Sequence, residues 1–393
     1  MNSLLINLNV IKKIILKLVG IIFDLVFSQS IIMFRKLNII FLILFFISFN
    51  SYSQVLNEND SIDNRIKADS IKINDGPYVF IKKDVLIEKS IIDGEVITKE
   101  LPIDAYKTEF HPEEAIFEDV DNIVVLSDIH GQFDLAIEIL KNNKVIDSNL
   151  NWTLGSGHLV IVGDIFDRGP KVTETLWFVY HLEQQALKSG GKVHFTLGNH
   201  EYMILRKDLR YLNSKYRVTS YLLKTNYTDL FNNQTVLGRW LRSKPTVLKI
   251  NKDTYVHGGL SKAFLDLGYN IDSVNKLMRE SIDVPKDQLK ETPFYINYYG
   301  SSGPIWYRGY FNDNLPESEI KEILKEINSK HIIVGHCSNE EVVQLYNEKI
   351  FGVDSSIKNG VYGEVLLING KKYIRGTMEG KEESFKKETV SSD

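Results

Sequence analysis

The sequence predicts an α/β protein in which two β-sheets pack against each other and helices cover their outer faces. Short β-branched runs recur after residue 121, and several are too continuously apolar to leave one face in water. Helical patterns alternate with the early runs, whereas the carboxyl half is richer in strands, an order typical of a layered α/β sandwich. The content of 43% apolar and 25% charged residues is that of a globular protein.

The elements of this sandwich follow from local spacing. We expect helices in FDLAIEILKNN (133–143) and TETLWFVYHLEQQALKSG (173–190), where apolar residues recur at helical intervals and a glycine pair ends the second. A helical stretch rich in Tyr and Arg is expected at 201–245. Strands are expected at 122–127, 158–163, 192–197, 246–250, 254–258, 331–335, 342–346, 349–353 and 364–368.

The amino terminus has the order of a secretory signal. Arg35 and Lys36 precede the uncharged apolar segment LNIIFLILFFISF, and small and polar residues follow. We therefore predict that residues 1–53 are a signal or targeting segment, that translation begins at Met33, and that the protein is exported to the periplasm or secreted. The alternative is an uncleaved segment that anchors the protein, which would be its one contact with a membrane.

The rest of the chain divides by composition. Residues 54–75 are polar without a sustained period and are predicted to be a linker. Two β-rich runs flank Asp93–Gly94, so 76–117 is predicted to be a β-hairpin extension. The main domain is expected at 118–376, and the polar residues 377–393 are expected to be a disordered tail.

Charge and cysteine content limit the partners. A formal net charge of -4 and a pI near 6.2 give no reason to expect nucleic acid as a partner, because that binding needs clustered excess Lys and Arg. Cys337 is the single cysteine, so an internal disulfide is excluded and cysteine usage leaves the redox compartment open.

Polar motifs follow the predicted strands. They are SDIHG, GDIFDRG, GNHE, HGG and GH, in that order. A single match of this kind is more often a turn or a satisfied core group. Five matches in order indicate one site, because open sheets place their sites at the carboxyl ends of strands. The side chains that these motifs present are Asp128, His130, Asp164, Asp167, Arg168, Asn199, His200, His257 and His336.

The donor types point to divalent metal. Carboxylate, imidazole and amide oxygen suit hard or borderline ions such as Mn, Fe or Zn. Six candidate ligands exceed what one tetrahedral structural zinc needs, so we expect two divalent metal ions that share a bridging carboxylate. Asp164 is the natural bridge.

The ordered motifs resemble the signature of calcineurin-like metallophosphoesterases, and DRG with GNHE narrows the resemblance to the phosphoprotein-phosphatase-like branch. SSGPIWYRGYF (301–311) is similar to a further motif of the bacterial Shewanella-like phosphatases. The resemblance covers roughly residues 118–376. It implies a four-layer sandwich, with two mixed β-sheets packed together and flanked by α-helices.

The resemblance also implies roles. Asp128 and His130 would hold the first metal, Asp164 would bridge, and the second metal would be held by Asn199, His257 and His336. His200 would protonate the leaving group with Asp167 as its carboxylate partner, which suits acid–base catalysis by an imidazole. The phosphate would be bound by Arg168, Arg308 and Asn199, since a guanidinium presents a planar fork to phosphate oxygens.

The function expected from these features is hydrolysis of phosphate monoesters by an exported dimetal phosphatase, through attack of a metal-bridging hydroxide. The substrate would be a phosphoprotein or a small aryl phosphate, with phosphotyrosine among the candidates. Two alternatives stay open. One is a phosphodiesterase or a hydrolase of nucleotide phosphoanhydrides on the same fold, and the other is a non-catalytic binding module.

Overall fold

The computed structural model describes residues 72–386 of the chain. The predicted signal segment, the choice of Met33 as the start and most of the predicted linker lie outside these residues. Among the helices between residues 72 and 386, none combines the length and the apolar composition that crossing a membrane requires.

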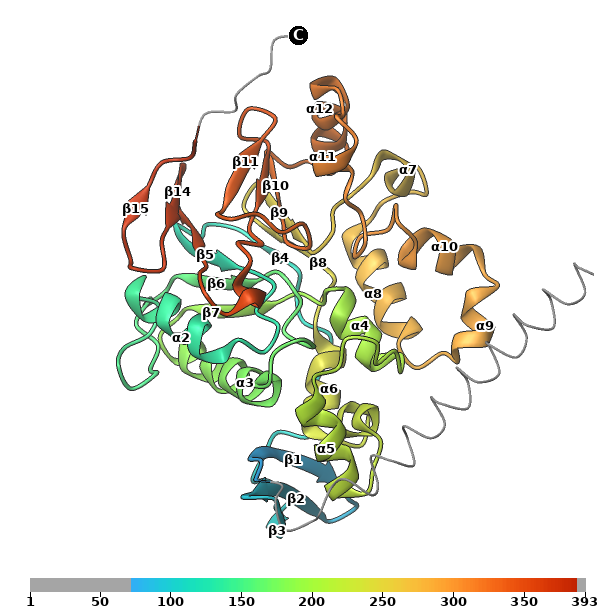
Figure 1. The fold of residues 1–393 in the computed structure, drawn as a ribbon. Coiled ribbons are helices and arrows are strands. Elements are labelled where there is room, and N and C mark those ends of the chain that lie inside the picture. The colour runs from blue at the N-terminus through green and yellow to red at the C-terminus, as the bar shows by residue number, and fades with distance from the viewer. Residues whose placement is uncertain (1–71, 387–393) are drawn as a thin grey trace, which may run out of the picture. The chain divides into compact units, whose positions relative to one another are not determined.

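Two six-stranded sheets form the centre of the molecule (Figure 1). The first has the order β15 (Glu382–Glu383), β14 (Lys372–Gly376), β13 (Val365–Asn369), β5 (Asn122–Leu126), β6 (His158–Ile161), β7 (Lys192–Phe195). The second has the order β11 (Val343–Leu345), β12 (Ile350–Gly352), β10 (His331–Val334), β9 (Asp253–Val256), β8 (Val247–Ile250), β4 (Ile116–Phe117). Both sheets mix parallel and antiparallel pairs.

An apolar layer joins the two sheets. Val125 and Val160 of the first sheet and Leu248, Tyr255 and Ile333 of the second are fully buried in one cluster. These strands are apolar on both faces because each sheet is covered on its other side by helices. The predicted fold class, a layered α/β sandwich, is therefore confirmed.

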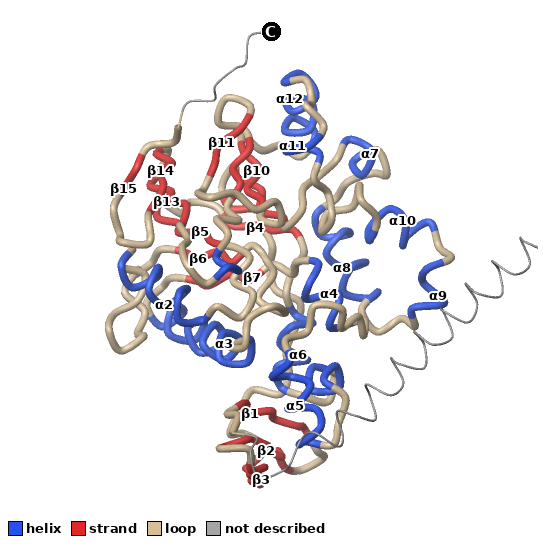
Figure 2. Tube along the Cα trace, viewed as in Figure 1, coloured by secondary structure: helices blue, strands red, loops and turns tan. Residues whose placement is uncertain are grey.

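The helices lie outside the sheets, as the blue segments of Figure 2 show. Their bounds are α2 (Phe133–Asn142), α3 (Val172–Lys188), α4 (Asn199–Leu205), α5 (Ser214–Leu223), η2 (Tyr227–Phe231), α6 (Val236–Ser243), α7 (Lys262–Leu265), α8 (Ile271–Ser281), α9 (Lys286–Lys290), α10 (Pro293–Tyr299), α11 (Gly309–Asn312), α12 (Glu317–Glu326) and η3 (Ile357–Asn359).

Local sequence explains how the helices dock. In α2, Leu135, Ala136, Ile139 and Leu140 are buried, which is the one-sided stripe of an amphipathic helix. Helix α8 docks on the second sheet through Asn275, whose side-chain oxygen accepts from the backbone N–H of Val247 at 2.9 Å and whose amide donates to the Val247 carbonyl at 2.8 Å.

The amino-terminal extension is a three-stranded antiparallel sheet of β1 (Asp75–Ile81), β2 (Val85–Ile92) and β3 (Glu95–Pro102). Its β2–β3 hairpin turns at Asp93–Gly94 with positive φ at both residues. The prediction of a hairpin alone is wrong, because the run before Asp93 contains two strands. Their turn is made of charged residues at 82–84 and has none of the glycine, proline or asparagine that marks most turns.

This small sheet is attached to helix α3 by hydrogen bonds. The Tyr78 hydroxyl lies 3.0 Å from the Thr173 hydroxyl, and the Trp177 indole N–H donates to the Pro77 carbonyl at 2.7 Å. The Asp75 carboxylate accepts from Thr219 of α5 at 2.6 Å. The sheet thus buttresses the helices behind the site loops.

The carboxyl end corrects a second prediction. Residues 377–386 are not a disordered tail, because β15 pairs antiparallel with β14 and Phe385 packs 5.5 Å from the ring of Phe351. The strand was missed because Glu382 and Glu383 are exposed at the sheet edge, where pairing needs no apolar face. Residues 387–393 lie outside the described part of the chain.

Candidate active site

Apart from Arg308, which precedes α11, the predicted site residues lie in the loops after β5, β6, β9 and β10 and at the start of α4, which follows β7. Backbone bonds tie these loops together: the Asp128 N–H donates to the Gly163 carbonyl at 3.1 Å, and the Gly335 N–H donates to the His257 carbonyl at 3.0 Å. The parallel pairing of β5 with β6 and β6 with β7 explains why motifs far apart in sequence converge.

The loops are strained where they turn side chains inward. Left-handed backbone is costly for residues with a Cβ and clusters at functional sites. Gly163, with φ of 83°, shows how close the loops approach, since a Cβ there would meet Gly198 Cα and His257 Nδ1 at 2.7 Å. Positive φ occurs at six predicted site residues: Asp128, His130, Asp164, Asp167, Arg168 and His336.

Asp164 lies at the centre of the cluster. Its side chain is buried, and Oδ2 is 3.2 Å from His257 Nε2, 3.6 Å from His130 Nε2 and 3.8 Å from His200 Nε2. One carboxylate oxygen therefore faces three imidazole nitrogens, which is the arrangement that a bridging ligand needs.

Two sets of residues whose side chains could bind a metal ion share Asp164. One contains His130, Asp164 and His200, and the other contains Asp164, His257 and His336, with the donor atoms of each group within 4.8 Å of one another. Asp128 and Asn199 complete the set. Asp128 Oδ1 is 3.8 Å from His130 Nε2, and Asn199 Oδ1 is 2.9 Å from His257 Nε2.

The structure thus brings all six predicted ligands together, and it adds one detail. His200, predicted as a proton donor, points Nε2 into the same group as His130. Asp128, predicted as a ligand there, turns Oδ2 toward the Ser127 hydroxyl at 2.6 Å and the His336 N–H at 3.0 Å.

The ring nitrogens are oriented for ligation. His130 Nδ1 lies 2.7 Å from the Phe166 carbonyl and His257 Nδ1 lies 2.8 Å from the Val162 carbonyl. A carbonyl can only accept, so each Nδ1 carries the proton when the ring is neutral and each Nε2 offers its lone pair to the centre. His336 Nε2 is buried with no hydrogen-bond partner among residues 72–386, which fits a metal ligand.

Burial and Asp164 set the charges of the site. Burial lowers the pKa of His130 to about 3 and that of His336 to about 2, so both rings are neutral, as ligation requires. Burial also acts to lower the pKa of His257, but the Asp164 carboxylate outweighs it and raises that pKa to about 10. In return, although burial acts to raise the pKa of Asp164, the surrounding imidazoles of His257, His200 and His130 hold it well below its usual range.

His200 is held by a carboxylate behind it. Its Nδ1 is 2.6 Å from Asp167 Oδ2, and both side chains are buried. Because the Nδ1 proton is engaged by Asp167, the ring presents Nε2 to the centre. This is the orientation that a proton donor to a leaving group needs.

Glu201 has a larger role than capping α4. Its carboxylate accepts from the backbone N–H of Gly198 at 2.8 Å, and from those of Asp164, Ile165 and Phe166 at 2.8, 2.7 and 3.2 Å. It thereby joins the loop that carries Asp164 to the loop that carries His200. Its place three residues into the helix is the recognisable signal of a capping box, whereas its bonds to the Asp164 loop have no local signal.

The two predicted phosphate-binding arginines have exposed side chains beside the cluster. The Arg308 guanidinium donates to the His336 carbonyl at 3.0 Å. The Arg168 guanidinium lies 5.3 Å from the ring centroid of Tyr211, and that ring is 5.2 Å from the His200 ring. Sequence analysis missed Tyr211, which lies in a loop with no motif.

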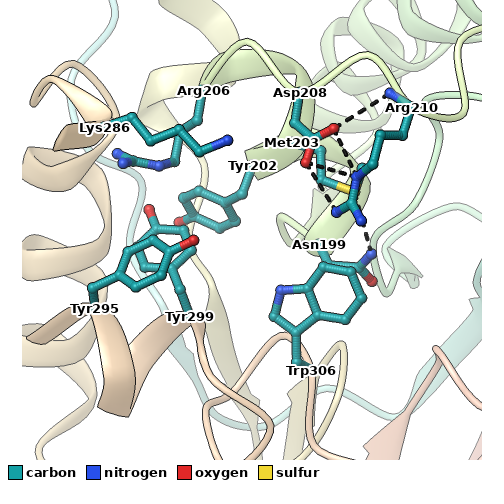
Figure 3. Close-up of a pocket in the computed structure, with 10 residues that line it drawn as sticks. All are labelled: Asn199, Tyr202, Met203, Arg206, Asp208, Arg210, Lys286, Tyr295, Tyr299 and Trp306. Atoms are coloured by element: carbon teal, nitrogen blue, oxygen red, sulfur yellow. Dashed lines mark hydrogen bonds and ion pairs between the residues drawn. The ribbon is translucent and has the colours of Figure 1, made fainter. Parts of the chain in front are cut away.

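Two cavities open next to the cluster. The first, of about 190 Å³, has Asn199 in its wall together with basic and aromatic side chains (Figure 3). The second, of about 510 Å³, is lined by Arg308 and its neighbours. Trp306 lines both cavities and lies edge-on to His336 at 5.5 Å, so it forms a partition beside the centre. Trp306 belongs to the motif at residues 301–311, but nothing in that motif alone predicts its place between the two cavities.

Several known proteins with related sequences are protein phosphatases. A family model described as calcineurin-like phosphoesterase matches residues 122–337. The chain is 28% identical over 245 residues to Shewanella-like protein phosphatase 1 of Plasmodium berghei, which covers 60% of this chain and 67% of that protein. It is 23% identical over 292 residues to Shewanella-like protein phosphatase 2 of Arabidopsis thaliana, with 62% and 73% covered.

A solved structure extends the likeness to three dimensions. The crystal structure of a cold-active protein-tyrosine phosphatase of a psychrophilic Shewanella species is 39% identical, has a TM-score of 0.76, and matches 80% of this chain and 100% of that one. Since the family model covers more than half of the chain, the protein is a phosphatase of the calcineurin-like phosphoesterase family, which uses a dimetal centre, and Shewanella-like protein phosphatases are among its relatives.

Proposed function

We propose that the protein hydrolyses phosphate monoesters of the aryl type, with phosphotyrosine in proteins as the substrate class. The observation that carries this proposal is the pair of His200 and Asp167, 2.6 Å apart, whose free imidazole nitrogen faces Asp164. A positioned acid of this kind serves a reaction in which an oxygen leaves with a proton. The similar Shewanella structure, described as a protein-tyrosine phosphatase, supports the aryl substrate.

The proposed ligands indicate which metal ions the site would bind and what those ions would do. Asp128, His130 and Asp164 would hold one ion, and Asn199, His257 and His336 would hold the other with Asp164 shared. Their mixed oxygen and nitrogen donors suit Mn, Fe or Zn. When bound, two such ions polarise the phosphate oxygens and activate a water for in-line attack on phosphorus.

The protein supplies the rest of the reaction. His200 gives the proton on Nε2 to the departing phenolate or alkoxide oxygen, while Asp167 keeps Nδ1 engaged and stabilises the charged ring. Arg168 and Arg308 bind phosphate oxygens that carry charge in the transition state. Asn199, as a neutral ligand, leaves its metal ion more attractive to an anionic phosphate oxygen.

A substrate panel tests this function. The full chain, loaded separately with Mn, Fe or Zn, would be assayed on a phosphotyrosyl peptide, a phosphoseryl peptide, p-nitrophenyl phosphate, bis-p-nitrophenyl phosphate and a dinucleoside tetraphosphate. We expect kcat/KM to be highest for the two aryl monoesters. Faster cleavage of the diester or of the phosphoanhydride would contradict the proposal and favour the alternative chemistry of the fold.

We further propose that residues 1–53 direct export and are absent from the mature protein, because the basic, apolar and small-residue order that follows Met33 is that of a processing signal. Amino-terminal sequencing of the protein from culture fractions of its host tests this. A mature chain that retains Ile39 would contradict cleavage. Deletion of residues 1–32 is the control, and it should leave export unchanged if translation begins at Met33.

A further inference from the structure

Apart from Asn199, the residues that wall the smaller cavity beside the cluster are used in no step of the proposed reaction. Its lining comes from α4, the loop after it, α9 and α10, and it includes Arg206, Lys286, Tyr295, Tyr299 and Trp306. Figure 3 shows Arg206 and Lys286 side by side on one side of the cavity, with Asn199 and Trp306 on the other. An occupant would therefore reach from the proposed metal ligand Asn199 to a pair of cations.

Neither cation forms an ion pair in the described part of the chain, although Lys286 is close enough to Asp208 to favour the charged form of that carboxylate. Arg206 donates through Nη1 to the Ser281 carbonyl at 2.5 Å, whereas its Nη2 is buried without a hydrogen-bond partner. Lys286 is exposed, and within residues 72–386 it makes neither a hydrogen bond nor an ion pair. The carboxylate of the same wall, Asp208, is already paired with Arg210 at 2.9 Å. A buried guanidinium nitrogen without an acceptor is costly, so a bound anion would stabilise this wall.

The aromatic walls are fixed in place. Tyr295 and Tyr299 stack with ring centroids 5.3 Å apart and an interplanar angle of 14°. The Arg206 guanidinium lies 4.9 Å from the Tyr299 ring, and the Tyr299 hydroxyl lies 2.7 Å from the Ser281 hydroxyl. The cavity is thus formed before any ligand arrives, which limits the entropy that an occupant loses on binding.

Size and position restrict the occupant. A volume of about 190 Å³ is below the roughly 300–1,000 Å³ of sites for whole small molecules, so it suits one side chain. Neither Arg168 nor Arg308 lines this cavity, so Asn199 is the one proposed phosphate-binding residue among the residues that line it. The occupant is therefore another part of the same substrate.

We propose that this cavity is a subsite for the carboxylate of an acidic residue that flanks the phosphotyrosine of a protein substrate, with Lys286 and Arg206 as the residues that bind it. The inference rests on the proposed function, because it assumes that the reacting group belongs to a peptide. It makes the enzyme selective for acidic sequence around the phosphorylated residue.

Binding of peptides tests the subsite without turnover. The metal-loaded full chain would be titrated with two labelled peptides that carry a difluorophosphonomethyl-phenylalanine in place of phosphotyrosine, with Glu or with Gln at the flanking positions. Fluorescence anisotropy should give a Kd about tenfold lower for the Glu peptide, which is the lower end of the range for a hydrogen bond to a charged group. The difference should shrink as salt rises, because the site is partly exposed.

Two lysines of the same short helix give a matched pair of variants. Lys286 lines the cavity and Lys290 does not, although both side chains are exposed. Substitution by Met removes one positive charge in either case. Lys286→Met should remove most of the preference for Glu, and Lys286→Glu should reverse it. Lys290→Met should keep the preference of the unmodified protein.

The outcomes separate this inference from the proposed function. Equal affinity for the two peptides, failure of both to bind, or an equal effect of Lys286→Met on both peptides would overturn the subsite. An effect of Lys290→Met as large as that of Lys286→Met would do the same. Turnover of p-nitrophenyl phosphate reports on the proposed function alone. If no ester is cleaved while the Glu preference remains and depends on Lys286, the function fails and the subsite stands.

Discussion

The described part of the chain contains two groups of buried histidines that differ in kind: one lies within strands β6 and β7, and the other lies beyond the carboxyl ends of the strands. His158, the first residue of β6, and His194, within β7, form a buried pair with ring nitrogens 2.9 Å apart, and the Phe117 ring packs on both. Beyond the carboxyl ends of the strands lies the cluster around Asp164. Both groups are buried imidazoles at short distance, yet the groups of metal-ligand type found in residues 72–386 all belong to the second.

The difference lies in the carboxylates. Burial lowers the pKa of His158 to about 4 and that of His194 well below its usual range, and with aromatic neighbours the pair stays neutral. Burial does the same to His130 and His336, but Asp164 reverses it for His257. Burial alone therefore makes a packed polar pair, and a shared carboxylate is what makes a binding centre for cations.

The strongest test of this contrast removes the shared carboxylate. Asp164→Asn should reduce turnover to background and reduce bound metal from about two ions per chain, because a neutral amide bridges two cations poorly. Elemental analysis and an aryl phosphate assay would measure both. The control is His158→Gln, which alters the His158–His194 pair and should leave the metal content of the protein unchanged. Full metal occupancy and full activity in Asp164→Asn would contradict the bridging role.

The next test separates ligation from proton donation within the site. His200→Asn should keep both metals and lose about 10²–10⁴ in kcat for an alkyl phosphate, the range for one acid–base group. The loss should be smaller for p-nitrophenyl phosphate, whose leaving oxyanion is stable without a proton. If metal content falls with activity, then His200 is a ligand, as its place beside His130 and Asp164 allows.

A third test compares the cations at the edges of the two clusters. Arg308 borders His336, and Lys192 lies 4.4 Å from the Phe117 ring that covers the histidine pair. Arg308→Ala should lower kcat/KM for monoesters by about ten- to hundredfold, mainly through KM, and weaken inhibition by free phosphate. Lys192→Met should change neither constant. Intact phosphate inhibition in Arg308→Ala would make that arginine structural.

The smallest effect concerns stability. Burial lowers the pKa of His158 to about 4, whereas an imidazole in the unfolded chain titrates near about 6.5. The unfolded state therefore binds more protons below about pH 6.5, so the stability present above that value is lost as pH falls toward the folded pKa.

His158→Gln removes this titration. Between about pH 7.5 and about pH 5, the Tm of this variant should fall less than the Tm of the unmodified protein, by roughly 1–2 °C for each kcal/mol of stability that the titration of His158 costs. Differential scanning calorimetry would measure the slope. His111→Gln, a change at an exposed position, is the control. An unchanged slope in His158→Gln would show that the pair does not titrate as its burial indicates.

Much of the fold and of the site could be predicted because the signals are local. Apolar runs identified most strands of both sheets, although β4, β14 and β15 were missed. Polar motifs directly after several of these strands identified the side chains that the structure gathers around Asp164. The predicted fold class and the family resemblance are confirmed.

What could not be predicted depends on contacts between distant segments. The turn before β2 contains no glycine, proline or asparagine, and β15 is a strand of two polar residues that pairs with β14. Tyr211 and Lys286 lie in segments without a motif, and they reach the site because α4, α9 and their loops fold beside it. The role of a single residue of this kind depends on the tertiary arrangement, which the hydrophobic periodicity of the sequence does not predict.

The carboxylate of Glu201 has a consequence for how the enzyme chooses its ions. Four backbone N–H groups from two loops converge on it, so the spacing between Asp164 and His200 is set by the polypeptide and not by whatever is bound. Because these two loops are already ordered, little of the free energy of metal binding is lost in ordering them, and they adapt little to an ion of the wrong radius. Discrimination among divalent ions should therefore depend on fit to a stiff frame, and exchange of one ion for another should proceed without unfolding of the loops.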